Sequence, residues 1–202
     1  MTRRTTRARR PGNLRCGVAL PSFHIEITKQ GWLGTPSDDY DPAVVDLCSH
    51  GDIRLVIGGE VIADGDDGDG VGISEAALGL LRTLSSDYRG SHDDPYGDRL
   101  IPHGCGTILM MGCGIGIDWS VGHLSDQVCI TDVVRYESSG PIRYPGLEVL
   151  VASSYYRADV VAFAQHAKEP FEGIEKSFSS PDERVEYSSS GRSNDHLLRV
   201  AR

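Results

Sequence analysis

The sequence predicts one α+β domain, in which a mainly antiparallel sheet of about six strands packs against about three helices. Two observations carry this prediction. Apolar residues alternate with polar ones along several short segments, as in strands that bury one face. Glycine-containing turns join these segments, and helical patterns are few, which favours hairpins over parallel βαβ units. The centre of the prediction is a meander of strands over residues 101–152.

The domain boundaries follow from composition. Residues 1–15 carry six arginines, no acid and no apolar periodicity, so we expect a disordered basic arm. Residues 16–176 hold the periodic segments and form the globular domain. Residues 177–202 are rich in serine and charge, which predicts a loosely ordered polar tail. No stretch is apolar for the length of a membrane span.

The first strand is expected at 22–28, where Phe23, Ile25 and Ile27 alternate with polar residues. Two further strands, at 53–57 and 60–63, flank the pair Gly58-Gly59. A two-residue glycine turn between strands predicts a tight hairpin with positive φ angles.

Between these strands a short helix is expected at 43–49. Asp41 is placed to cap its first turn, and Pro42 suits the first helical position. Gly51 is interpreted as the residue just past its end.

Two longer helices are predicted from capping residues and i, i+4 spacing. Ser74 is expected to cap a helix that reaches about Leu84, and Ser154 a helix that Pro170 ends. The buried face of the second of these helices is predicted to comprise Tyr156, Val160, Phe163, Ala164 and Ala167.

The meander supplies the remaining strands. They are predicted at residues 107–111, 115–121, 128–134 and 147–151. Asp132 interrupts the alternation of the third of them. Residues 86–98 and 136–146 carry no apolar pattern and are interpreted as loops.

Charge is distributed unevenly along the chain. The formal net charge is −9, and removing the arginine-rich arm leaves 14 basic against 29 acidic residues. Between Asp38 and Asp69 there are ten acids and one base, Arg54. Such a surface repels nucleic acid and attracts basic proteins, so contact with nucleic acid is expected at most through the arm. The alternative is that the charge serves solubility alone.

The leading hypothesis is therefore a non-catalytic binding protein with an acidic face for a basic protein partner. Bacterial toxin-neutralising immunity proteins act in this way, although no motif identifies that class here. Trp32 is considered as an aromatic anchor, since tryptophan dominates many interfaces. The residues predicted to bind the partner are Asp38, Asp39, Asp64, Asp66, Asp67, Asp69 and Trp32.

The alternative hypothesis is a small enzyme centred on residues 103–132. His103 and Cys105 are two residues apart on an expected strand, so their side chains share a face. A thiolate nucleophile needs a neighbouring base of this kind. The five cysteines have no paired framework and no export signal precedes them, which predicts reduced thiols in a bacterial-type cytoplasm. Their spacing with the histidines lacks the paired pattern of zinc sites, so no metal is expected.

The segment from Leu109 to Gly116 resembles the glycine-rich first motif of Rossmann-like S-adenosylmethionine-dependent methyltransferases. The resemblance implies that Gly112, Gly114 and Gly116 approach the cofactor, and that Asp132 binds its ribose. The residues after the glycines have a period of two, however, which favours a glycine-rich turn between two strands. On that interpretation no cofactor is expected.

Overall fold

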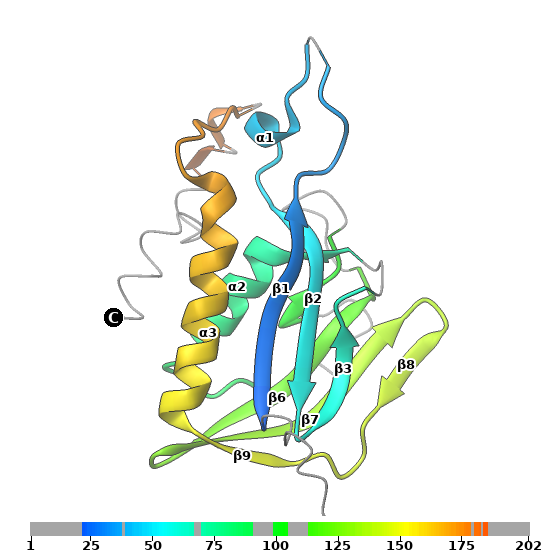
Figure 1. The fold of residues 1–202 in the computed structure, drawn as a ribbon, viewed down its shortest axis with the longest axis vertical. Helices are drawn as coiled ribbons and strands as arrows, with labels where there is room; N and C mark the ends of the chain where they lie inside the picture. The colour runs from blue at the N-terminus through cyan, green and yellow to red at the C-terminus, as the bar shows by residue number, and fades with distance from the viewer. Residues whose placement is uncertain are drawn as a thin grey trace, which may run out of the picture.

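The computed structural model describes residues 22–37, 39–66, 70–90, 99–104, 113–178, 180–182 and 184–185. Within them, two antiparallel sheets of four and five strands pack with three α-helices (Figure 1). The predicted α+β class is confirmed, although the strands form two sheets and not one. The strand expected at 107–111 lies outside the described residues, as do the basic arm and most of the polar tail.

The first sheet consists of β1 (Phe23–Gly31), β2 (His50–Ile57), β3 (Glu60–Asp64) and β4 (Val71–Gly72). β2 lies at its centre and pairs with the other three strands. The β2–β3 hairpin turns at Gly58 and Gly59, whose φ angles are 62° and 84°. These left-handed values cost glycine no strain. The first predicted strand and the Gly58-Gly59 hairpin are therefore confirmed.

The second sheet consists of β5 (Ile101–Pro102), β6 (Gly116–Leu124), β7 (Gln127–Glu137), β8 (Gly140–Arg143) and β9 (Val149–Ala152). β7 is central and pairs with β6, β8 and β9. The prediction of a loop over 136–146 is wrong, because β7 extends into this segment and β8 follows. β8 is a largely exposed edge strand, so it lacks the alternation by which strands are recognised.

Asp132 occupies a bulge between β6 and β7. The register passes from Ser120 opposite Thr131 to Asp118 opposite Val134, which leaves an extra residue on β7. Asp132 adopts a left-handed φ of 55° at this point. A bulge shifts the side-chain alternation by one residue, which explains why Asp132 breaks the apolar pattern.

The helices are α1 (Pro42–Val45), α2 (Ile73–Arg82) and α3 (Ser153–Lys168), which continues into the 3₁₀ turn η1 (Glu169–Phe171). Asp41 caps α1 as predicted, since its carboxylate accepts a hydrogen bond from Ala43 N at 2.9 Å. The expected extent of this helix is wrong: it ends at Val45, and Gly51 belongs to β2.

Neither predicted serine caps its helix. The N-caps are Gly72 for α2 and Ala152 for α3, because β4 and β9 run directly into these helices. Ser74 instead accepts a hydrogen bond from Ser49 N at 3.1 Å through its hydroxyl oxygen. This bond ties α2 to the residues that precede β2.

The core lies between the two sheets and the helices. Phe23 contacts both Trp119 of β6 and Tyr156 of α3, with ring centroids 6.3 and 4.8 Å away. All five residues predicted for the inner face of α3 are buried, which confirms that face. Figure 1 shows the first sheet in front of β6 and β7, with α3 alongside β1. None of the helices in the described ranges is long and apolar enough to span a membrane.

Candidate functional site

Two segments that adjoin the first sheet carry the described acidic residues that were predicted to bind a partner. Asp39 belongs to the loop between β1 and α1, and Asp64 and Asp66 lie at and just beyond the end of β3. All three are exposed. Asp38, Asp67 and Asp69 fall outside the described residues. Asp52, on β2 between these segments, adds a partly exposed carboxylate.

Two basic residues of the first sheet, Lys29 and Arg54, lie beside these acids, and Lys29 lies opposite Asp52 in the sheet register. Arg54 lies opposite both Glu26 and Asp64 in the sheet register and contacts the Glu26 carboxylate at 3.7 Å. Among the described residues, no ion pair involves Asp39, Asp52 or Asp66. These carboxylates therefore keep their charge available to a partner.

The loop of residues 32–46, here named the tip loop, projects beyond the end of the sheet (Figure 1). The Asp46 carboxylate closes its base by accepting hydrogen bonds from Leu33 N at 3.0 Å and Cys48 N at 3.1 Å. Burial raises the pKa of Asp46, but the contact with His50 and these two bonds outweigh that effect, so the pKa lies below its usual value. The base of the tip loop is thus held by a charged group.

The tip loop also carries exposed apolar side chains. Leu33, Tyr40 and Val45 are 42%, 41% and 41% exposed. Single exposed apolar residues are common on protein surfaces, but these three share one projecting loop with Asp39 and Asp41. Apolar and aromatic side chains bordered by charge are typical of protein interfaces.

Trp32 packs against the end of the chain's own helical region. Its ring meets Phe171 edge-on, with centroids 4.8 Å apart, and the Lys176 ammonium lies 3.6 Å from its centroid. Lys176 also donates hydrogen bonds to the carbonyls of Ala43 at 2.7 Å and Asp46 at 2.6 Å. Trp32 is therefore half-buried, and through Lys176 it is joined to the backbone of Ala43 and Asp46.

The contacts of Lys176 predict that the stability of the fold depends on pH. Burial lowers the pKa of Lys176 to about 8 from its ordinary 10.5, although the nearby negative charges of Asp46, Cys48 and Asp41 oppose this. Between these pH values Lys176 binds more protons in the unfolded chain than in the folded one, so its contribution to the free energy of unfolding rises with pH. We expect the difference in the free energy of unfolding between the wild type and Lys176→Met to shift in favour of the wild type as pH rises across this range, measured by urea unfolding. An identical pH dependence in both proteins would contradict the burial of the Lys176 ammonium in these contacts.

A buried polar cluster lies beneath the tip loop. His50 Nε2 lies 3.1 Å from Asp46 Oδ2, and His50 Nδ1 has no hydrogen-bond partner among the residues that the structure describes. The Cys48 thiol contacts the Glu75 carboxylate. The backbone at Gly104 packs so closely that a Cβ there would lie 2.4 Å from His50 Nδ1. The imidazole is thus enclosed, which suits support of the loop better than contact with a substrate.

His103 contacts a different cysteine from the one predicted. Its Nδ1 lies 3.5 Å from Cys113 Sγ, and both residues are partly exposed. Cys105 lies outside the described residues. A cavity of about 20 Å³ adjoins His103 and is lined also by Arg135 and Tyr136. That volume suffices for about one water molecule.

The glycine motif begins a strand of an antiparallel sheet. Gly116 opens β6, and a Cβ at this position would lie 2.5 Å from the Ile101 carbonyl. Close approach of β5 therefore accounts for this glycine. Gly114 lies in the bend before β6, Gly112 is outside the described residues, and Asp132 sits in the β7 bulge. A strand follows the glycines, where the Rossmann-like arrangement has a helix.

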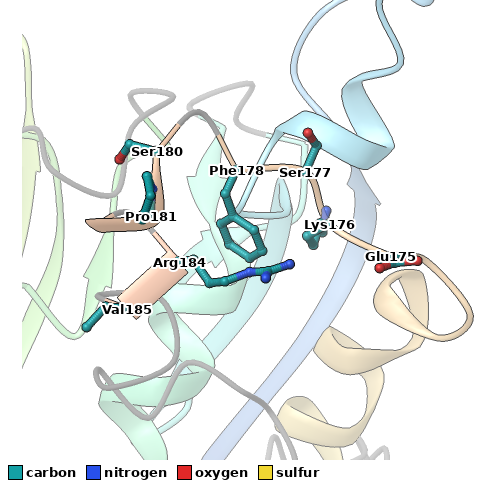
Figure 2. Close-up of a pocket in the computed structure, with 8 residues that line it drawn as sticks. All are labelled: Glu175, Lys176, Ser177, Phe178, Ser180, Pro181, Arg184 and Val185. Carbon is teal, nitrogen blue, oxygen red and sulfur yellow. The ribbon is translucent and has the colours of Figure 1, made fainter.

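A pocket lies along the C-terminal segment. Figure 2 shows it between Lys176, Phe178 and Arg184, with a volume of about 760 Å³. The Arg184 guanidinium lies 5.3 Å from the centroid of the Phe178 ring. The described residues that line it include neither histidine nor cysteine. No three metal-ligating side chains gather anywhere in the described ranges.

Comparison with models of protein families, with curated proteins and with solved structures finds no match. Sequence reasoning missed Asp46, His50, Glu75 and Lys176, which fix the tip loop. The i, i+4 spacing of Asp46 and His50 was an available signal, but only the structure joins them to Leu33 and Lys176.

Proposed function

We propose that this protein acts in the cytoplasm as a non-catalytic binding protein for a basic protein partner. The binding surface in this proposal, here named the acidic end, comprises the tip loop together with Asp52, Asp64 and Asp66. The observation that carries the proposal is that the tip loop combines the exposed Asp39 with the exposed Leu33, Tyr40 and Val45. Asp66, just beyond β3, is also exposed, Asp52 on β2 is partly exposed, and none of these three carboxylates forms an ion pair within the described residues.

The two kinds of side chain have different roles in binding. Carboxylates spread over separate segments create a field that attracts a basic partner and speeds association, most strongly at low salt. Apolar and aromatic side chains supply area that leaves water on contact and so slow dissociation. The tip loop is held by the hydrogen bonds of the Asp46 carboxylate and of the Lys176 ammonium, which limits the conformational entropy that binding removes.

A toxin-neutralising, immunity-type role is the concrete form of this proposal. In such a role the acidic end covers a basic functional surface of the toxin, which blocks it without any chemical step. A carboxylate surface competes for the same cationic side chains that bind phosphate groups.

The test is capture of the partner from native cells by tagged wild-type protein and by the triple variant Asp39→Asn, Asp52→Asn, Asp66→Asn. The expected result is one stoichiometric basic protein, bound by the wild type in a salt-sensitive manner. We expect the variant to bind it at least about tenfold more weakly, with reduced salt dependence, because three attractive charges are gone.

The matched control neutralises three exposed acids elsewhere, in Asp126→Asn, Glu148→Gln, Glu60→Gln. This control changes the net charge by the same amount, so it separates local attraction from overall charge. Equal binding by both triple variants and the wild type would exclude the acidic end as the contact surface. Equal weakening in both variants would indicate a general charge effect and would also count against it.

A further inference from the structure

We propose that Cys113, paired with His103, is a nucleophilic thiol site that exchanges with low-molecular-weight disulfides. The Sγ of Cys113 lies 3.5 Å from Nδ1 of His103, and both side chains are partly exposed. The pair forms no part of the acidic end, so this inference is independent of the proposed binding function.

Strand pairing positions the two side chains. Ile101 and Pro102 of β5 pair with Ile117 and Gly116 of β6. The chain continues this pairing beyond β5, because His103 N donates a hydrogen bond to Ile115 O at 3.3 Å. His103 also forms a β-bridge with Val71 on its other side. The imidazole is therefore carried on backbone held from both sides, while Cys113 approaches it from the segment before β6.

Two of the three described cysteines, Cys48 and Cys129, lie beside a carboxylate, whereas Cys113 lies beside an imidazole. Cys48 is 3% exposed and contacts the Glu75 carboxylate. Cys129 is partly exposed, and its Sγ lies 3.8 Å from Glu148 Oε1. Burial raises the pKa of Cys129, and the Glu148 carboxylate raises it further. Of the three cysteines that the structure describes, Cys113 lies beside an imidazole, a base that can accept a thiol proton.

The chemical step balances without any further reactant. His103 accepts the thiol proton of Cys113, and the thiolate attacks one sulfur of the small disulfide. The new S–S bond joins Cys113 to that sulfur, the old S–S bond breaks, and the second sulfur leaves as a thiolate that can take the proton from His103. The cavity beside His103 has room for about one water molecule, so the disulfide reaches the sulfur from the solvent side.

The experiment uses the full chain and 2-hydroxyethyl disulfide, with the adduct on each cysteine followed over time by peptide mass spectrometry. At neutral pH we expect Cys113 to form its mixed disulfide at least about tenfold faster than Cys129, which provides an internal control of similar exposure. His103→Gln is expected to slow Cys113 by a similar factor and leave Cys129 unchanged.

Two further readouts separate a base from a merely structural role. His103→Gln should change the pH dependence of the rate at Cys113 and leave that at Cys129 unchanged. Cys48 reports folding, because its thiol reacts only if the core opens. Equal rates at Cys113 and Cys129 in the wild type would overturn the proposal. So would an unchanged rate and pH dependence of Cys113 in a folded His103→Gln protein.

Discussion

Gly51→Ala is expected to lower the free energy of unfolding by about 3 kcal/mol or more. A Cβ at Gly51 would lie 1.8 Å from the carbonyl oxygen of Lys29 and 2.7 Å from its carbonyl carbon. These atoms belong to the backbone of β1, where the register with β2 shifts between Ile27 and Lys29. No side chain can rotate to relieve the overlap, so the two strands have to separate at the base of the tip loop.

Gly31→Ala is the matched control, since Gly31 lies on the same strand pair and is followed by the tip loop. A Cβ at Gly31 would meet nothing within 4 Å, so we expect a change of less than about 0.5 kcal/mol. Urea unfolding of the two variants measures the difference directly. Equal stabilities would mean that β1 and β2 do not approach each other as closely as the structure has them.

Asp118→Ala is expected to lower the free energy of unfolding by about 3 kcal/mol. Asp118 is fully buried on β6, although it is charged. Its Oδ1 accepts hydrogen bonds from the Tyr88 hydroxyl at 3.0 Å and from Leu100 N at 3.2 Å. Alanine leaves both donors without this acceptor, and unpaired buried donors are costly.

Asp118→Asn is the control for this second prediction. Asparagine keeps a carbonyl oxygen of similar position, so it should retain part of the lost stability. We expect its unfolding midpoint in urea to lie between those of the wild type and Asp118→Ala. If Asp118→Ala matched the wild type, the contacts of Tyr88 and Leu100 with this strand would contribute nothing to stability.

The parts of the fold that were predictable are those set by local periodicity. The alternation around Phe23, the Gly58-Gly59 turn and the inner face of α3 all depend on residues close together in the chain. Where apolar spacing and turn residues agree, they specify a single local structure. The interruption at Asp132 was visible for the same reason, although its cause, a bulge, was not.

The parts that were missed depend on contacts between distant segments. In the sequence Asp118 alternates with the apolar residues of its strand, as a residue on a polar face does, but it is fully buried and accepts hydrogen bonds from Tyr88 and Leu100. The pairing of β5 with β6 brings His103 to Cys113. The spacing of these residues along the sequence does not show this pairing. Lys176 contacts Trp32, although the two residues are far apart in the sequence. Such pairings follow from topology, which local pattern does not specify.

Hydrogen exchange of the protein, with and without its captured partner, tests most directly whether the acidic end is the binding surface. We predict that binding slows exchange in residues 32–46 and at the strand positions near Asp52 and Asp64, and leaves β7 to β9 unchanged. Protection confined to β7, β8 and β9, with none in the tip loop, would contradict the claim.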